Sequence, residues 1–184
     1  QITVNNVNEA PTGTVTIIGI ARQGEELTAS NDIQDADGMG TITYTWSNGK
    51  TGEKITLVQA DVGNQIIVTA SYTDLLGSSH EVPSDPTDAV VNVNDAPTGT
   101  LTINGTATQG QTLTAINNIQ DADGIDEDTV SYQWKASNDS GGYDNISGAT
   151  GATATTYILT QAEVGKTITV TLSYTDNHSS DHTV

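Results

Sequence analysis

The sequence contains no cysteine and no phenylalanine, and its 184 residues include one methionine, two tryptophans and four prolines. Without cysteine the chain has no disulfide, no thiol nucleophile and no cysteine-ligated zinc site. No apolar run approaches the length of about 18 residues that a membrane-spanning helix needs, so we predict no membrane insertion by these residues. The sequence starts at Gln1 without a signal peptide, so we expect it to be a piece of a longer protein.

Positive charge is also scarce. Five Lys and Arg residues stand against 23 Asp and Glu residues, which gives a net charge of −18 and a pI of about 4.1. Binding to nucleic-acid phosphates needs patches of Lys and Arg, so we predict no nucleic-acid partner. The sequence contains neither a G-x-S-x-G motif nor a phosphate-binding loop, and we expect the protein not to be an enzyme.

The abundant residues are the β-branched ones: 31 Thr, 16 Ile and 14 Val together make up 61 of the 184 residues. A branched Cβ packs well on a pleated strand and is disfavoured in helices. Hydrophobic residues make up 34% of the chain, which is enough to build cores, unlike the composition of a disordered acidic tail. The composition therefore predicts an all-β protein.

The chain repeats itself. Three segments return in its second half: EAPTGTVTI at 9–17 as DAPTGTLTI at 95–103, NDIQDADG at 31–38 as NNIQDADG at 117–124, and LVQADVGNQIIVTASYTD at 57–74 as LTQAEVGKTITVTLSYTD at 159–176. The first two pairs are offset by 86 residues and the third by 102, so the second copy contains insertions of 2 and 14 residues. We predict two repeats, 9–94 and 95–184, each the size of a small β-sandwich.

The ends of the chain are out of phase with these repeats. The sequence AVVNVNDAP at 89–97 closes the first repeat, and its counterpart TVNNVNEAP stands at 3–11. We therefore expect residues 1–8 to be the closing strand of a preceding repeat, and the second repeat to lack its own closing strand. This predicts strand exchange, in which the amino-terminal strand of one copy completes the second repeat of another.

Alternating apolar positions indicate the strands. Ile42, Tyr44 and Trp46 share one strand face, and Val130, Tyr132 and Trp134 repeat this pattern. About seven short strands per repeat, divided by Asn-Gly and Asp-Gly turns, predict two tandem immunoglobulin-like (cadherin-like) Greek-key β-sandwiches. Both tryptophans are expected in the cores, in preference to surface positions where they would stack on a sugar.

Carboxylates lie in three groups that we expect to meet at one end of each sandwich. Each repeat has an Asp-Ala-Asp-Gly turn, an aspartate that ends the Tyr-Thr-Asp strand, and an Asn-acid pair before a proline. These residues are Asn8, Glu9, Asp35, Asp37 and Asp74 in the first repeat, and Asn94, Asp95, Asp121, Asp123 and Asp176 in the second. Ca²⁺ requires six to eight oxygen ligands, and clustered carboxylates repel each other without a cation. The alternative is that these residues only form turns.

The order of the motifs resembles a known family. VNVNDAP at 91–97 resembles the linker between cadherin repeats, and QDADG at 34–38 resembles their Asp-Ala-Asp segment. The sequence NDAPTG followed by TQGQTLTA, DADG, YQW, GATG and the YTD tail most resembles the extender repeats of large bacterial surface adhesins, including RTX-type adhesins. The resemblance covers nearly the whole chain.

This resemblance implies a non-enzymatic rod of repeats that holds an adhesive tip away from the cell. The rod would be extracellular, at the bacterial cell surface or associated with the outer membrane, and its partners would be the neighbouring repeats of the same chain. Calcium would stiffen the junctions. Asn94, Asp95, Asp121, Asp123 and Asp176 would then form the inter-repeat site, and the five residues of the first repeat would form its counterpart.

Three further features remain open. His80, His178 and His182 lie in polar sequence without metal-ligand spacing, so we expect solvated loop histidines. The insertion at 135–156 predicts an extra hairpin, and the alternative is a loop with which the second repeat binds a glycan or a protein. A further alternative is an accessory domain of a surface hydrolase.

Overall fold

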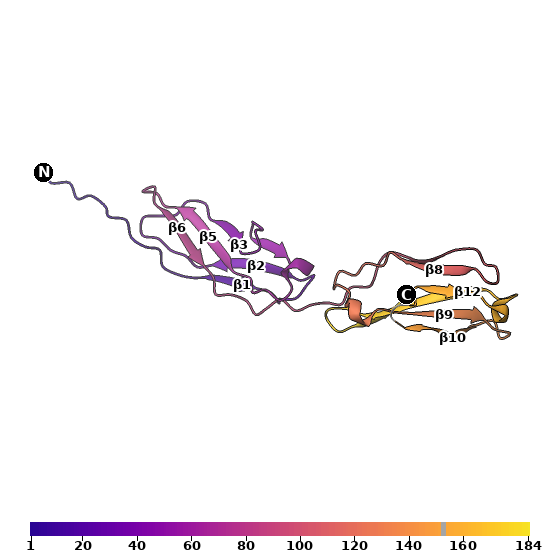
Figure 1. Cartoon of the computed structure of the whole chain (residues 1–184). Coiled ribbons are helices and arrows are strands. Elements are labelled where there is room, and N and C mark those ends of the chain that lie inside the picture. Colours follow the sequence, from indigo (N-terminus) through magenta and orange to yellow (C-terminus); the bar gives the residue numbers. More distant parts are fainter. Residues whose placement is uncertain (152–153) are drawn as a thin grey trace. The chain divides into compact units, whose positions relative to one another are not determined.

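The computed structural model describes residues 1–151 and 154–184, with the backbone alone for 147–151 (Figure 1). These residues form strands and three single-turn 3-10 helices, with no α-helix among them, so the predicted all-β class is confirmed. None of the described helices is long and apolar enough to cross a membrane. The chain divides into two compact units, Gln1–Val93 and Asn94–Val184, called unit 1 and unit 2 below.

Unit 1 contains two three-stranded sheets whose neighbouring strands are antiparallel. One sheet has the order β1-β2-β4 and the other the order β3-β5-β6. The elements are β1 (Val15–Ile18), β2 (Glu26–Asn31), β3 (Thr43–Trp46), β4 (Lys54–Thr56), η1 (Gln59–Asp61), β5 (Val68–Thr73) and β6 (Ser79–Pro83).

Unit 2 repeats this arrangement with one more strand. Its sheets have the orders β11-β8-β7 and β10-β9-β12-β13. The elements are β7 (Leu101–Asn104), β8 (Thr112–Asn117), η2 (Glu127–Thr129), β9 (Ser131–Ser137), β10 (Tyr143–Gly151), β11 (Thr156–Ile158), η3 (Gln161–Glu163), β12 (Ile168–Thr175) and β13 (Asp181–Thr183). Strand β10 is the insertion and pairs antiparallel with β9, so the predicted extra hairpin is confirmed. Residues 152–153 of the insertion lie outside the described residues.

Each unit has one hydrophobic core to which both of its sheets contribute. Alternate residues of β5 face inward, with Val68 and Ala70 fully buried, and Trp46 of β3 is 1% exposed. In unit 2 the corresponding Trp134 is fully buried. Each indole N–H donates to a backbone carbonyl, Trp46 to Gly52 at 2.8 Å and Trp134 to Ala154 at 3.0 Å. The predicted core position of both tryptophans is confirmed, and neither ring can stack on a sugar.

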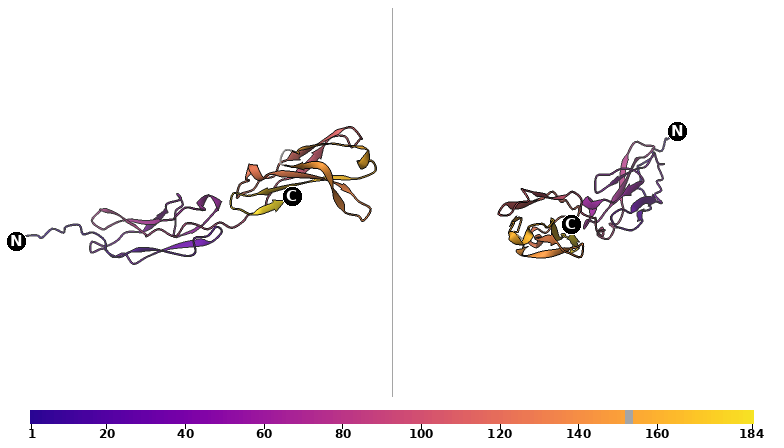
Figure 2. Two further views of the ribbon diagram at one scale, coloured as in Figure 1. Left: turned by 60° about the horizontal axis from the view of Figure 1, so that its bottom comes forward. Right: turned by 90° about the vertical axis from the view of Figure 1, so that its right-hand side faces the viewer.

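The amino-terminal residues differ from expectation. Residues 1–10 form no strand and are all exposed, including Val4, which is 92% exposed (Figures 1 and 2). A single extended segment has no partner for its backbone N–H and C=O groups, so it gains nothing from adopting strand geometry alone. The matching residues 89–93 do have a partner, because Val90 forms a parallel bridge with Val62 and is 3% exposed.

Candidate metal centres

The two Asp-Ala-Asp-Gly segments form the same tight turn. The first carboxylate accepts a hydrogen bond from the backbone N–H two residues later, Asp35 from Asp37 at 2.9 Å and Asp121 from Asp123 at 2.9 Å. The glycine that follows Asp37 has a φ of +77°, a conformation that residues with a Cβ rarely adopt. This turn gives the two aspartates of each segment different surroundings.

The second carboxylate of each turn holds the segment that enters the unit. Asp37 accepts a hydrogen bond from the backbone N–H of Glu9 at 2.8 Å and another from the side-chain amide of Asn6. Asp123 accepts one from the backbone N–H of Asp95 at 2.6 Å. Both carboxylates are buried, and Oδ1 of Asp123 has no hydrogen-bond partner within the described part of the chain. An ionised oxygen in this position lacks the compensation that buried charge normally has.

Repulsion between these acids is visible in unit 1. The negative charge of Asp37 is the largest of the effects that raise the pKa of Glu9, followed by burial, a hydrogen bond with Asp37 and the charge of Asp35. A cation between these carboxylates would remove the repulsion. The entry segment and the turn together therefore form an acidic group with chemistry that suits a hard cation.

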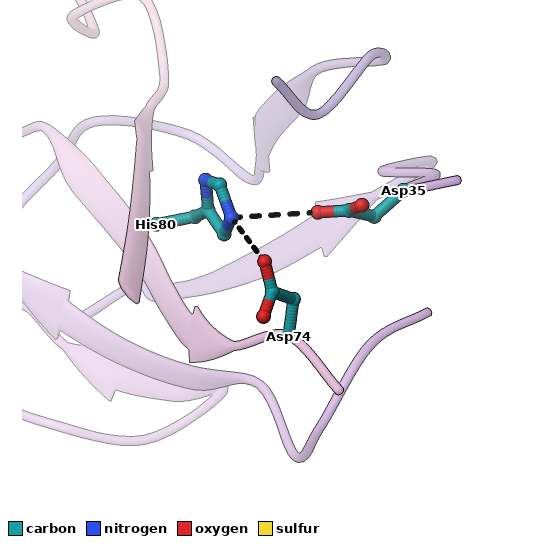
Figure 3. A group of neighbouring side chains, drawn as sticks. All are labelled: Asp35, Asp74 and His80. Carbon is teal, nitrogen blue, oxygen red and sulfur yellow. Dashed lines mark hydrogen bonds and ion pairs between the residues drawn. The ribbon is translucent and has the colours of Figure 1, made fainter. Parts of the chain in front are cut away.

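The first carboxylate of each turn belongs to a different cluster, which Figure 3 shows for unit 1. The Nε2 atom of His80, on β6, lies 3.0 Å from Oδ2 of Asp74 and 3.6 Å from Oδ2 of Asp35. The Tyr72 hydroxyl donates to the same oxygen of Asp35 at 2.6 Å, and the other oxygen of Asp74 accepts two backbone N–H groups at 2.8 Å. Both carboxylates are fully buried, while the His80 side chain is 11% exposed.

Unit 2 reproduces this cluster closely. The Nε2 atom of His182, on β13, lies 3.2 Å from Asp176 and 3.6 Å from Asp121, and the Tyr174 hydroxyl donates to Asp121 at 2.6 Å. The histidine ring stacks on the tyrosine ring in both units, with centroids 5.1 Å apart in unit 1 and 5.0 Å apart in unit 2. We call Asp35, Asp74 and His80, and likewise Asp121, Asp176 and His182, the triads.

The environment fixes the protonation of the groups around each triad. Burial, together with the hydrogen bond to Asp35 and the nearby negative charges, raises the pKa of Tyr72 to about 12, so its hydroxyl remains a donor at neutral pH. For Asp74 burial is the largest single effect and raises the pKa. The hydrogen bonds from His80 and from backbone N–H groups outweigh it, and the pKa is lowered below its usual value of 3.8. The pKa of Asp176 is lowered for the same reasons.

Each triad could hold a metal ion, because one ligand atom from each residue lies within 4.8 Å of the others. Two carboxylate oxygens and one imidazole nitrogen are a donor set that suits Zn²⁺ or another transition metal. Ca²⁺ takes oxygen ligands, six to eight of them, and an imidazole is not one of its usual partners. The triads thus fit a transition metal better than calcium, and the acidic group at the entry segment fits calcium better.

The structure brings most of the predicted ligands into two linked groups per unit. Glu9 and Asp37 form the entry group of unit 1, and Asp35 connects this turn to Asp74. The same links join Asp95, Asp123, Asp121 and Asp176 in unit 2.

The two junction asparagines stay outside these groups. Asn8 is exposed and makes no side-chain hydrogen bond among the described residues. The amide of Asn94 donates to the carbonyl oxygen of Asp95 at 3.2 Å, away from the carboxylates.

The expectation of solvated loop histidines is wrong for two of the three. His80 and His182 lie on strands, and their side chains are 11% and 10% exposed. Only His178 is exposed in a turn. The repeat contained the missed signal, because each buried histidine follows the strand-ending aspartate by six residues in both copies.

Comparison with known proteins adds no assignment: no protein-family model matches the sequence, and no curated protein matches it. A function for the chain therefore has to be argued from the two units themselves.

Proposed function

We propose that the chain is a pair of tandem immunoglobulin-like, cadherin-like β-sandwich repeats that serve as a non-enzymatic spacer in a bacterial surface adhesin. In this proposal calcium binds the acidic entry group of each unit and stiffens the chain where it enters the unit. The adhesin would be extracellular, at the cell surface or the outer membrane, and its function would be cell adhesion or biofilm attachment.

The strand order supports the sandwich. In unit 1, β2 pairs with β4 while the intervening β3 lies in the other sheet beside β5, which is how a Greek-key chain passes between two sheets. Side chains from both sheets fill one core, and a buried tryptophan stands on β3, where immunoglobulin-like domains place theirs. Unit 2 has the same relation between β8, β11 and β9.

The observation that carries the calcium proposal is the bond between the entry segment and the buried second aspartate of the turn, which occurs in both units. Glu9 bonds to Asp37, and Asp95 bonds to Asp123, in each case through the backbone N–H of the acid that precedes the Ala-Pro pair. Side-chain and backbone oxygens at this point are the ligand type of Ca²⁺. A bound ion would also give Oδ1 of Asp123 a partner.

A cation in this place links function to the medium. Calcium-binding extracellular modules have dissociation constants of about 10⁻⁴–10⁻³ M, so the entry segments would be rigid in calcium-rich surroundings and loose without calcium. For a spacer this dependence sets the reach of whatever the repeats present.

The test is calcium titration calorimetry together with thermal melting in chelator and in millimolar calcium. The wild-type chain should bind calcium in both units. Asp37→Asn should lose the site of unit 1, and Asp123→Asn the site of unit 2. Calcium at tenfold over its dissociation constant should stabilise the occupied unit by about 1.4 kcal/mol. Asp139→Asn is the matched control, because Asp139 is exposed on the β9–β10 turn and the charge change is the same.

An identical melt in chelator and calcium would remove calcium from the proposal and leave the spacer. A zinc arm identifies the other candidate ion. Stabilisation by Zn²⁺ that is lost in His182→Ala, with no effect of Ca²⁺, would assign the metal to the triads instead.

A further inference from the structure

Unit 2 contains a groove that in unit 1 is filled by the chain itself. The groove has a volume of about 380 Å³. Its lining comes from the segment after β7, from η3 and the residues after it, and from the start of β12: Ala107, Thr108, Gln109, Leu159, Thr160, Glu163, Val164, Gly165, Lys166 and Ile168. The counterparts of these residues in unit 1 include those that bind residues 89–93.

In unit 1 four backbone hydrogen bonds hold this closing segment. Val90 donates to Asn64 O and accepts from Gly63 N, both at 2.9 Å. Val91 donates to Ala21 O at 2.9 Å and accepts from Gln23 N at 3.0 Å. The segment thereby bridges two stretches of backbone in parallel pairing, and the Val90 side chain closes the core.

The corresponding groups of unit 2 are open. The backbone N–H groups of Gln109 and Gly165, which match the two donors of unit 1, make no hydrogen bond to another described residue. Val164 is 57% exposed, whereas its counterpart Val62 is half-buried. Ile168 is half-buried, whereas its counterpart Ile66 is 1% exposed. An unpaired backbone edge beside uncovered apolar side chains is an acceptor for an added strand.

We propose that this groove binds the amino-terminal segment of a second copy of the chain. Residues 3–7, TVNNV, match residues 89–93, AVVNV, and Val4 takes the place of Val90. Val4 is 92% exposed in its own unit, and the same valine position is 3% exposed where the groove is filled. The register places Val4 beside Gly165 and Lys166, and the following residue between Ala107 and Gln109.

The segment is free to make this contact. Residues 1–8 lie outside every strand and are exposed, and the hydrogen bond of Asn6 to Asp37 leaves the first five residues loose. The spacing from Val4 to Pro11 equals that from Val90 to Pro97, so a docked segment can keep its bond to Asp37. Donor segment and acceptor groove lie on different units, so the association is heterologous and gives head-to-tail chains or a closed ring.

Sedimentation equilibrium over a range of concentrations tests the proposal with the chain as it is. The average mass of the wild type should rise with concentration. Val4→Asp should weaken association about tenfold or more, because it removes a buried valine and places a charge against the core. Ile2→Asp is the matched control in the same segment. Its counterpart in unit 1 is Asp88, which is exposed, so an aspartate at position 2 should leave association unchanged.

A peptide of residues 86–94 provides a second measurement, since it is the segment that fills the groove of unit 1. Added in excess, it should dissociate the assemblies of the wild type. A monomer mass at every concentration would overturn the proposal, and so would association that Val4→Asp leaves at the wild-type strength. Either result can be obtained with folded protein, because both substitutions lie in exposed residues outside the strands.

Discussion

The two units have the same polar framework and differ in how their cores are covered. Each has an Asp-Ala-Asp-Gly turn, a triad and a tyrosine that donates to it, with distances that agree within 0.2 Å. In unit 1 the closing segment buries Val90 and Ile66, whereas in unit 2 the equivalent Ile168 stays half-buried. The comparison shows that the acidic turn and triad do not depend on the closing segment. The polar clusters and the cover of the core are separate contributions to each unit.

The largest expected effect comes from making unit 1 resemble unit 2. Val90→Ala should destabilise unit 1 by about 2 kcal/mol, because it removes two buried carbon atoms and leaves a small cavity. Val91→Ala is the control on the adjacent residue, which is 61% exposed, and it should change stability by less than about 0.5 kcal/mol. Urea unfolding followed by tryptophan fluorescence measures both, and the transition of unit 2 should not move. Equal effects of the two substitutions would mean that the segment does not cover the core.

A smaller effect should have opposite signs in the two units. In chelator, Asp37→Asn should destabilise unit 1 by about 1 kcal/mol, because the side chain then accepts one hydrogen bond fewer. Asp123→Asn should stabilise unit 2 or leave it unchanged. It replaces the unpartnered oxygen of a buried charge, and its remaining oxygen can still accept from Asp95. Thermal melting in chelator is the measurement. Destabilisation by both substitutions would indicate that Oδ1 of Asp123 has a partner such as a bound water.

Much of this arrangement follows from sequence patterns that act locally. Alternation located the inward faces of β3 and β5, and the tryptophans are buried as predicted. The length difference between the copies predicted the β9–β10 hairpin. The carboxylates also meet as expected, because the turn and the end of β5 lie together in each unit.

Other features depend on register, which the pattern did not reveal. Tyr72 pairs directly with His80 across β5 and β6, and Tyr174 with His182 across β12 and β13. Directly paired residues point to the same face of a sheet, so the inward tyrosines require inward histidines. The different surroundings of Asp35 and Asp37 depend on hydrogen bonds within a four-residue turn, for which alternation carries no information.

The smallest predicted effect concerns acid sensitivity in unit 2. Burial raises the pKa of Glu163, but hydrogen bonds from the hydroxyl and the N–H of Thr160 and from Tyr157 outweigh it and lower the pKa below 4.5. Glu163 therefore contributes stability above pH 4.5 that is lost as the pH falls through the lowered pKa. Glu163→Gln should make the loss of stability of unit 2 below this pH shallower in a pH series of melts. Asp139→Asn should leave that slope unchanged, and a slope unaffected by Glu163→Gln would contradict the assignment.

The hydrogen bond of each buried indole has a consequence for how such repeats can change over time. Trp46 reaches a carbonyl six residues ahead, and Trp134 reaches one 20 residues ahead, yet both rings lie at the same place in their cores. The anchor is a backbone atom, so it places no demand on the identity of the residues between ring and acceptor. Fourteen residues were thus accommodated at this position while the core was kept. Natural variants can diversify here first, and a protein engineer can graft a foreign peptide at the same position.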